Sequence, residues 1–222
     1  MKNLHRLILI TLGSCSLLAA LPGRADIIIS EVMSSESASY NADWFELTNT
    51  GGSPVNISGW KMDDNSNSFA LSVGLTGVAS IGAGQSAIFI EGTATTISNF
   101  ETAWFGSAAN TPAGFLIGNY SGSGVGLSST ADAVNVFDST GTLITRVDFG
   151  AATTGVSFDN SIGLNNTTIS TLSSAGVHGA VVSPSGEIGS PGAVPEPGTY
   201  ALVIGGLALF AGFRIVRRLL AA

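Results

Sequence analysis

Short apolar runs separated by turn-forming residues make up most of this chain. The runs are rich in Ile, Val and Phe, which favour strands, and the segments between them are rich in Gly, Ser, Asn and Asp. This pattern predicts eight strands, at Ile27–Met33, Trp44–Asn49, Gly59–Met62, Ser68–Leu71, Ser86–Glu91, Phe115–Ile117, Ala133–Phe137 and Leu143–Phe149. In the last of these strands, alternate residues from Leu143 to Phe149 are expected to share one face.

A hairpin and one helix complete the predicted fold. Asp138-Ser139-Thr140-Gly141 lies between the last two strands and predicts a four-residue hairpin loop, because Asp can cap the turn and Gly accepts a positive φ. Ser98-Asn99-Phe100-Glu101 resembles a helix-capping box, and it overlaps residues at helical spacing: Ile97, Phe100, Glu101, Trp104 and Phe105. Closely spaced strands with one short helix predict an all-β fold, a single β-sandwich. Residues 151–193 hold fewer long apolar side chains, which predicts a loosely packed final part of the same domain.

The N-terminus has the pattern of a signal peptide. A basic stretch, Met1 to Arg6, precedes the apolar run Leu7 to Leu21, which is shorter than a usual membrane span. We expect residues 1–25 to be removed by cleavage after Ala25. Two alternatives stay open: a core helix, and a lipoprotein acylated at Cys15.

The C-terminus, residues 193–222, predicts a membrane-anchored tail. Two prolines keep Val194 to Gly198 out of a helix, and an apolar segment follows that predicts a transmembrane helix over 199–217. Basic residues at its end would stay in the cytoplasm and leave the rest of the chain on the export side.

This tail resembles the PEP-CTERM sorting signal. The resemblance is carried by Val194, Pro195, Glu196, Pro197 and Gly198, by the apolar helix, and by Arg214, Arg217 and Arg218. It implies a Gram-negative bacterium, and recognition by exosortase, a membrane protease-transpeptidase that processes such tails at the inner membrane.

Charge is distributed unevenly along the chain. Between Asp26 and Phe213, two basic residues face fifteen acidic ones, a net charge of −13. Such a segment repels a phosphate backbone, so we expect no nucleic-acid partner. The single cysteine, Cys15, lies in the first apolar run, so the body of the chain has neither a disulfide nor thiolate chemistry.

Three motifs in the first half of the body resemble a lamin tail domain. They are Ser30-Glu31-Val32, then Glu46-Leu47-Thr48-Asn49, then Asn56-Ile57-Ser58-Gly59-Trp60-Lys61-Met62-Asp63. A later turn and strand, from Ile81 to Ile90, also resembles that family, with Ala83 where its Pro is common. The match is best over 27–150, within a domain expected at 26–192. It implies an immunoglobulin-like sandwich in which Glu31, Glu46, Asn49 and Trp60 close turns and fill the core.

Candidate catalytic and metal residues are few. The exported part has one histidine, His178, in a Gly/Ala/Ser stretch without a nucleophile motif, so we interpret it as a surface loop residue. Zinc needs several His or Cys ligands, so we expect no zinc site. The glycine-rich stretch Gly122 to Gly126 lacks the strand-to-helix setting of a phosphate-binding loop, so we expect no phosphate site there. Two acidic pairs could mimic acid/base dyads, Asp43 with Glu46 and Glu91 with Glu101. Asp63 to Asn67 is rich in oxygen ligands but lacks the Gly and Glu of a calcium loop, so a solvated acidic turn is the preferred interpretation.

These observations predict an exported protein without a cofactor or bound metal and without catalytic activity. Its immunoglobulin-like β-sandwich, with one short helix, is flanked by a signal peptide and a C-terminal transmembrane helix. It would act as a binding or structural module at the cell surface or in extracellular matrix, with polysaccharide or surface proteins as candidate partners. The alternative function is a calcium-dependent or carboxylate-based extracellular hydrolase, which would need a carboxylate pair facing an open groove.

Overall fold

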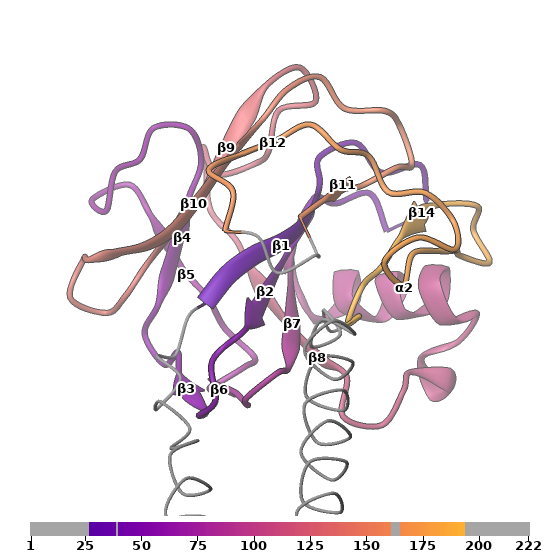
Figure 1. Cartoon of the computed structure of the whole chain (residues 1–222), viewed down its shortest axis with the longest axis horizontal. Coiled ribbons are helices and arrows are strands. Elements are labelled where there is room, and N and C mark those ends of the chain that lie inside the picture. Colours follow the sequence, from indigo (N-terminus) through magenta and orange to yellow (C-terminus); the bar gives the residue numbers. More distant parts are fainter. Residues whose placement is uncertain (1–26, 39, 161–164, 194–222) are drawn as a thin grey trace, which may run out of the picture.

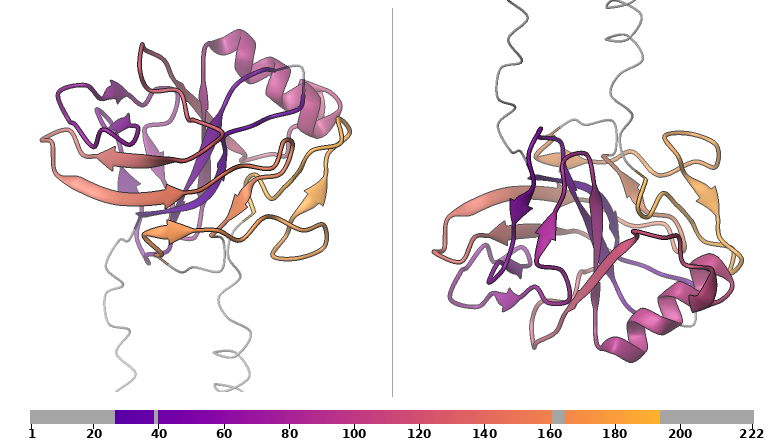
Figure 2. Two further views of the ribbon diagram at one scale, coloured as in Figure 1. Left: turned by 90° about the horizontal axis from the view of Figure 1, so that it is seen from above. Right: turned by 90° about the horizontal axis from the view of Figure 1, so that it is seen from below.

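Two five-stranded sheets form the body of the protein. The computed structural model describes residues 27–38, 40–160 and 165–193. The predicted signal peptide and the predicted transmembrane helix lie outside these residues. Figure 2 shows the two sheets facing one another in two views, which confirms the predicted β-sandwich.

The first sheet carries most of the motifs that resemble the lamin tail domain. Its strand order is β11-β1-β2-β7-β8, with bounds Phe158–Asp159, Ile27–Met33, Trp44–Asn49, Ser86–Glu91 and Leu116–Tyr120. Neighbours run antiparallel except β7 and β8, which are parallel. Strands β1 and β2 are buried along their whole length, because both faces of this sheet are covered.

The second sheet faces the first across the core. Its order is β12-β10-β9-β4-β5, with bounds Thr168–Ile169, Leu143–Phe149, Asp132–Phe137, Lys61–Asp63 and Val73–Gly74. Two small sheets pair β3 with β6 and β13 with β14, with bounds Val55–Asn56, Ser80–Ile81, Val181–Val182 and Ile188–Gly189. In β10 the alternate residues Thr145, Val147 and Phe149 are buried as predicted, whereas Leu143 is exposed beyond a shift in register.

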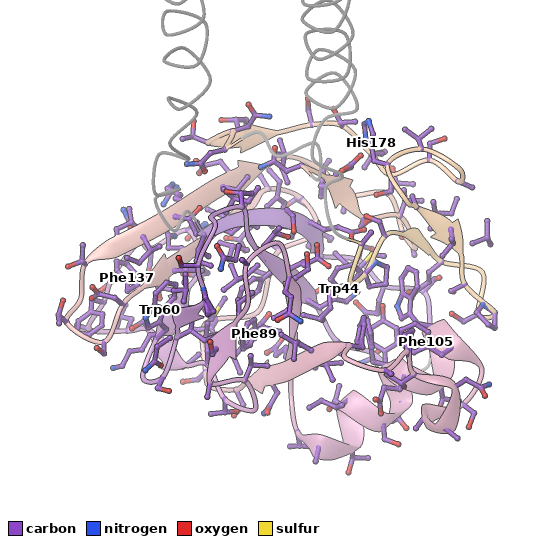
Figure 3. All side chains as sticks on the ribbon, turned by 60° about the horizontal axis from the view of Figure 1, so that its bottom comes forward. Trp44, Trp60, Phe89, Phe105, Phe137 and His178 are labelled. Carbon is purple, nitrogen blue, oxygen red and sulfur yellow. The ribbon has the colours of Figure 1, made fainter. Side chains whose placement is uncertain are left out.

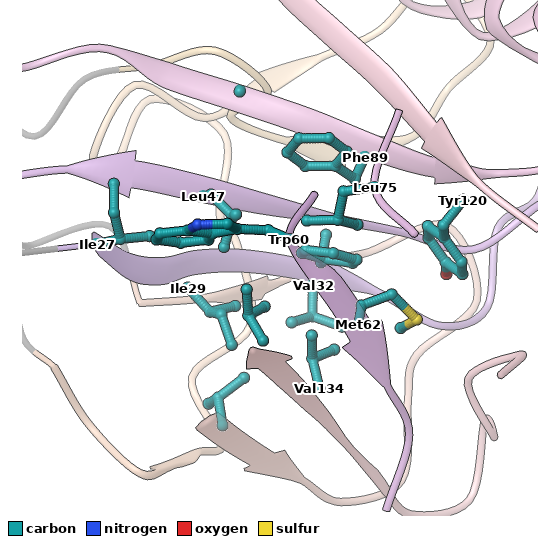
Figure 4. Packing of buried hydrophobic residues seen from close by; sticks show 14 of the residues in the cluster. Ile27, Ile29, Val32, Leu47, Trp60, Met62, Leu75, Phe89, Tyr120 and Val134 are labelled. Atoms are coloured by element: carbon teal, nitrogen blue, oxygen red, sulfur yellow. The ribbon is translucent and has the colours of Figure 1, made fainter. Parts of the chain in front are cut away.

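The main core fills the space between the sheets. Trp60 lies beside Ile27 and Leu47 in this core (Figure 4), and it is 8% exposed. Nearby, the ring of Phe45 packs against the rings of Phe89 and Tyr120, at centroid distances of 5.8 and 5.6 Å. The predicted burial of Trp60 between the sheets is therefore confirmed.

A second apolar cluster lies on the outer face of the first sheet, under helix α2, Ala94–Phe105. Trp44 of β2 meets Phe100 and Trp104 of the helix edge-on, at ring centroid distances of 5.8 and 6.0 Å. A short 3-10 helix, Ala108–Asn110, follows α2. Figure 1 shows α2 lying beside the sheet, near β7 and β8. The aromatic stripe of the helix is thus core packing, as the sequence indicated.

Two local predictions are wrong. The helix begins at Ala94 with Thr93 as its N-cap, because the Thr96 hydroxyl accepts the backbone N–H of Thr93. Ser98, the predicted cap, lies inside the helix. Ser68–Leu71 is a turn rather than a strand, because the N–H of Leu71 bonds back to the carbonyl of Ser68 and leaves the Leu71 side chain 64% exposed.

The predicted hairpin between β9 and β10 is confirmed. The N–H of Asp138 bonds to the carbonyl of Thr142, and the N–H of Gly141 bonds to the carbonyl of Asp138. One carboxylate oxygen of Asp138 accepts the N–H groups of Thr140 and Thr142, and Gly141 has a φ of 92°. Both residues therefore have the roles that the sequence indicated.

Truncation of Trp60 to Ala is expected to lower the free energy of unfolding by about 3–5 kcal/mol, because it leaves a cavity between the two sheets. Urea unfolding of the full-length chain in detergent, followed by the fluorescence of the other two tryptophans, measures this change. Leu71→Ala is the control: its exposed side chain should change stability by about 0.5 kcal/mol or less. Equal stabilities of the Trp60→Ala variant and wild type would contradict the packing described here.

Candidate functional site

Two buried carboxylates face each other on the side of the first sheet that points away from the main core. Glu31 of β1 is the direct antiparallel partner of Glu46 of β2. The register of this pair shifts between Ile29 and Glu31, which indicates a bulge that adds Ser30. The shift brings the side chains of Ser30, Glu31 and Glu46 together, and all three are fully buried.

The C-terminal segment covers this carboxylate pair. Glu31 accepts hydrogen bonds from the N–H of Ser190 at 2.7 Å, from its hydroxyl at 3.0 Å, and from the hydroxyl of Ser157. Glu46 accepts the N–H of Gly192 at 2.5 Å. The end of the domain, residues 190–193, is therefore attached to the sheet through hydrogen bonds.

Hydroxyl groups complete the environment of Glu46. Its second oxygen accepts the Ser30 hydroxyl at 2.5 Å and the Thr48 hydroxyl at 3.4 Å. Thr48 in turn lies 2.6 Å from the hydroxyl of Ser86, which donates to the carbonyl of Ala193 at 3.3 Å. A continuous polar strip thus crosses three strands beneath residues 190–193.

Burial governs the protonation of the pair. It raises the pKa of Glu31 to about 7, against the opposing effect of the hydrogen bonds from Ser157 and Ser190. Burial, together with the charge of Glu31, raises the pKa of Glu46 to about 8. Two facing carboxyls with such values hold about one proton between them at neutral pH.

A third buried carboxylate fixes the chain just before this segment. Glu187 accepts the N–H groups of Ser37 and Ala38, at 2.7 and 3.2 Å, and the hydroxyl of Tyr40 at 2.8 Å. The C-terminal segment is therefore tied to the loop after β1 as well as to β1 and β2.

His178 lies in an exposed loop, as predicted, and contacts a carboxylate. Its Nδ1 is 2.7 Å from Oδ2 of Asp159, and its side chain is 41% exposed. Figure 3 places it at the rim of the domain, away from Trp60 and Phe89. A Ser-His-Asp triad also needs a serine hydroxyl at the other ring nitrogen, and within the described residues no such bond is formed.

The two acidic pairs considered from the sequence have other partners in the structure. Glu31, rather than Asp43, lies opposite Glu46. The N–H of Glu91 bonds to the carbonyl of Asp43, and the charge of Glu91 acts on the Asp43 carboxyl. Glu101 instead accepts a hydrogen bond from the hydroxyl of Thr111. Because Glu31 and Glu46 are fully buried, they do not face the open groove that a carboxylate-based hydrolase requires.

Acidic side chains gather at one end of the sandwich. Burial raises the pKa of Asp43 to about 7, and the charges of Glu36, Glu91 and Asp132 raise it further against the opposing hydrogen bond from the N–H of Leu127. The same end holds the buried hydroxyl of Tyr120, which has no hydrogen-bond partner among the residues that the structure describes. We call Glu36, Asp43, Glu91 and Asp132 the acidic end.

The candidate calcium loop is a turn closed by its own side chains. Oδ2 of Asp63 accepts the hydroxyl of Ser66 and the N–H of Ser68, both at 2.6 Å. Asp63 itself is fully buried, so the expectation of a solvated loop is wrong at this residue. Within the described residues, no group of three or more His, Cys, Asp or Glu side chains is arranged to hold a metal ion.

Calcium is expected to leave the melting temperature of the protein unchanged, since only a ligand that prefers the native state stabilises it. Thermal unfolding with millimolar calcium, and with magnesium as the control cation, tests this. A rise specific to calcium that disappears in the double variant Asp63→Asn, Asp64→Asn would contradict the interpretation as a structural turn.

The family resemblance singled out Glu31 and Glu46 but assigned these two residues the wrong role. Asn49 does close a turn, since it donates to the carbonyls of Ser53 and Ile81. Glu31 and Glu46 instead bind the chain more than 140 residues further on. The only signal in the sequence was a pair of acidic residues in otherwise apolar strands, which does not reveal the partner.

The predicted sorting residues lie outside the described part of the chain. These are Val194, Pro195, Glu196, Pro197, Gly198, Arg214, Arg217 and Arg218. In the part that the structure describes, no helix has the length and apolar character needed to cross a membrane.

Comparison with known families agrees with both resemblances. The PEP-CTERM protein-sorting motif matches residues 193–218, and the Lamin Tail Domain matches residues 21–151. No curated protein matches the chain. The sorting motif marks a protein of a Gram-negative bacterium that is exported, held transiently in the membrane, processed by exosortase, and then located at the surface or outside the cell. Both matches are non-catalytic domain types. Since the second match covers more than half of the 222 residues, the chain belongs to the Lamin Tail Domain family.

Proposed function

We propose that this protein is a non-catalytic binding or structural module that exosortase delivers to the cell surface or extracellular matrix. In this proposal residues 1–25 are the signal peptide, 26–192 the domain and 193–222 the sorting signal. Its membrane helix is at 199–217, and processing occurs near Glu196. The observation that carries the proposal is the position of the sorting match, which begins at residue 193, after the two sheets of the sandwich and the Lamin Tail Domain match at residues 21–151. The sandwich is therefore the part that the tail delivers.

The direction in which the chain leaves the domain supports one orientation at the membrane. Ile27 at the start of β1 pairs with Asn49 at the end of β2, and Ala193 bonds to Ser86 at the start of β7. The two ends of the domain chain thus lie at the same end of the first sheet. The acidic end lies at the opposite end of these strands, so it would face away from the membrane while the tail is anchored.

The acidic end is the surface that we assign to partner binding. Glu36, Asp43 and Glu91 are partly exposed there and Asp132 is buried, and within the described residues no ion pair with Lys or Arg neutralises these carboxylates. Such a surface suits a basic patch on another surface protein, or a neutral polysaccharide that donates hydroxyl groups. It repels DNA, for which we expect no binding at physiological salt.

Cell fractionation and a binding assay test this function. Mass spectrometry of both termini of the exported form should find Asp26 at the start and an end near Pro195. The purified form should bind isolated surface or matrix material, and Glu36→Gln with Glu91→Gln should weaken that binding. Asp138→Asn, in the hairpin at the opposite end of β9, is the matched control. Hydrolysis of the matrix polysaccharide by the purified protein would instead support the enzymatic alternative.

A further inference from the structure

The last four described residues, Ser190–Ala193, lie directly before the predicted sorting motif, and we call them the strap. The strap is bonded to Glu31 through Ser190 and to Glu46 through Gly192, and Ser86 donates to the carbonyl of Ala193. In the sequence only Val194 separates the strap from Pro195. The chain is thus held against the sheet almost up to the motif.

This attachment conflicts with what a protease needs. A substrate bound in an extended conformation offers backbone N–H and C=O groups on both sides of the cleaved bond. The N–H of Gly192 and the carbonyl of Ala193 are already bonded to the domain. Releasing the four strap residues would free these groups and add about 13 Å of reach, at about 3.3 Å per extended residue.

We propose that Glu31, Glu46 and Gly189 are positioning residues for the sorting reaction, which hold the strap on the sheet, and that exosortase acts on the chain after the strap detaches. This inference rests on the proposed processing near Glu196. It assigns the buried carboxylate pair a role in presenting the tail rather than in catalysis.

The charges around the pair favour release when both carboxyls ionise. Glu31 faces Glu46 on β2 and Asp159 on β11, and the strap contributes only hydroxyl and N–H groups. Within the described residues no ion pair joins Glu31 or Glu46 to a basic group, and His178 is bonded to Asp159. Two adjacent buried negative charges are relieved by exposure to water, whereas a shared proton keeps them buried.

Gly189 lies between the anchored chain and the strap, at a position with no room for a side chain. The N–H of Ile188 bonds to the carbonyl of Gly155, and the carbonyl of Ile188 accepts the N–H of Ser157, so the chain before the strap is anchored. A Cβ on Gly189 would lie 2.7 Å from Oε1 of Glu31 and 2.9 Å from the ring of Trp104. Gly189→Ala should therefore push the strap away from its carboxylates.

Five variants of the full-length precursor, three in or beside the strap and two controls, separate the effect of the strap from that of global stability. Gly189→Ala loosens the strap, and Ser190→Ala removes only its hydroxyl bond to Glu31. The double variant Glu31→Gln, Glu46→Gln keeps the pair uncharged and the strap closed. Gly150→Ala is the matched glycine control, because its Cβ would meet nothing within 4 Å. Asp43→Asn neutralises a buried carboxyl at the far end of the sheet, and controls for a change in overall stability.

Processing and strap opening are measured on the same chains. Pulse-chase labelling in an exosortase-containing host gives the processing rate. Hydrogen exchange of residues 190–193, in the full-length chain in detergent, gives the opening of the strap. We expect Gly189→Ala to raise exchange about tenfold and processing several-fold, with smaller increases for Ser190→Ala. The double Gln variant should slow both several-fold, and the two controls should match wild type.

The outcomes distinguish the two proposals. If wild type is processed and every variant is processed at the same rate, the strap proposal is overturned, even where hydrogen exchange at residues 190–193 changes. A wild type that is not processed overturns the proposed sorting at Glu196, and the strap proposal with it. Altered processing in Asp43→Asn, equal to that of the double Gln variant, shows that global stability sets the rate and also overturns the strap proposal.

Discussion

Replacing Glu31 and Glu46 together by Gln is expected to raise the free energy of unfolding at pH 8.5 by on the order of 5 kcal/mol. At this pH the wild-type protein must bury two facing negative charges, whereas an amide is neutral. Each Gln keeps a carbonyl oxygen for the N–H of Ser190 or Gly192, and its amide N–H can donate to a neighbouring serine hydroxyl. The hydrogen bonds are therefore retained while the cost of burying charge is removed.

The same residues set how stability depends on pH. The folded pKa values of about 7 and 8 lie above the ordinary glutamate value of 4.5, so between these limits the folded protein binds more protons than the unfolded chain. Stability from these groups is fully present below about pH 4.5 and is lost as the pH rises through 7 and 8. Wild-type stability should therefore fall between pH 5 and pH 8.5.

Urea unfolding at several pH values in this range checks both expectations. The double Gln variant should show a much flatter pH profile than wild type. Asp43→Asn should remove a smaller part of the slope, since the Asp43 pKa is also raised, to about 7. Hydrogen bonds from Thr140 and Thr142 lower the pKa of Asp138, so this residue stays ionised throughout the range, and Asp138→Asn should leave the slope unchanged. Parallel profiles for wild type and the double variant would refute the buried-charge explanation.

Strands were predictable wherever both the residues and their spacing favoured a strand. Four strands have the predicted bounds: Ile27–Met33, Trp44–Asn49, Ser86–Glu91 and Leu143–Phe149. In each, a run of β-branched and aromatic residues is followed directly by turn-forming residues. The short strands of residues 151–193 were not predicted. Each has two residues, and its place depends on contacts with distant strands rather than on local preference.

The carboxylate pair could not have been assembled from the sequence. Its geometry depends on the register shift at Glu31, on the pairing of β1 with β2, and on the return of Ser190 and Gly192 to the same face. None of these long-range features leaves a local pattern. Asn49 and Trp60 were predictable because a turn and a core position are properties of the nearby sequence.

Replacing Pro195-Glu196-Pro197 by three alanines is expected to stop processing and leave a membrane-bound precursor. From the sequence we expect the prolines to keep Val194 to Gly198 extended, so that a protease can bind this segment as a strand. Alanine favours helix, so the predicted transmembrane helix would extend towards the domain and its backbone groups would be bonded internally. The loss should be complete, which is a larger effect than any strap variant produces.

Immunoblotting of cell fractions with an antibody to the domain measures this loss. Wild type should appear as a shorter form outside the inner membrane, and the triple-alanine variant as the longer form within it. The basic cluster provides a second variant, in which Arg214, Arg217 and Arg218 are changed to Gln. This variant should hold the end of the helix in the cytoplasm less firmly, because moving a charged Arg across the hydrocarbon costs more free energy than moving a neutral Gln. The domain itself should fold equally in all three chains, since the substitutions lie outside the described sheets and their cores. Normal loss of the C-terminal helix from the triple-alanine variant would mean that the prolines do not present the segment to the protease, and that the tail is an ordinary anchor.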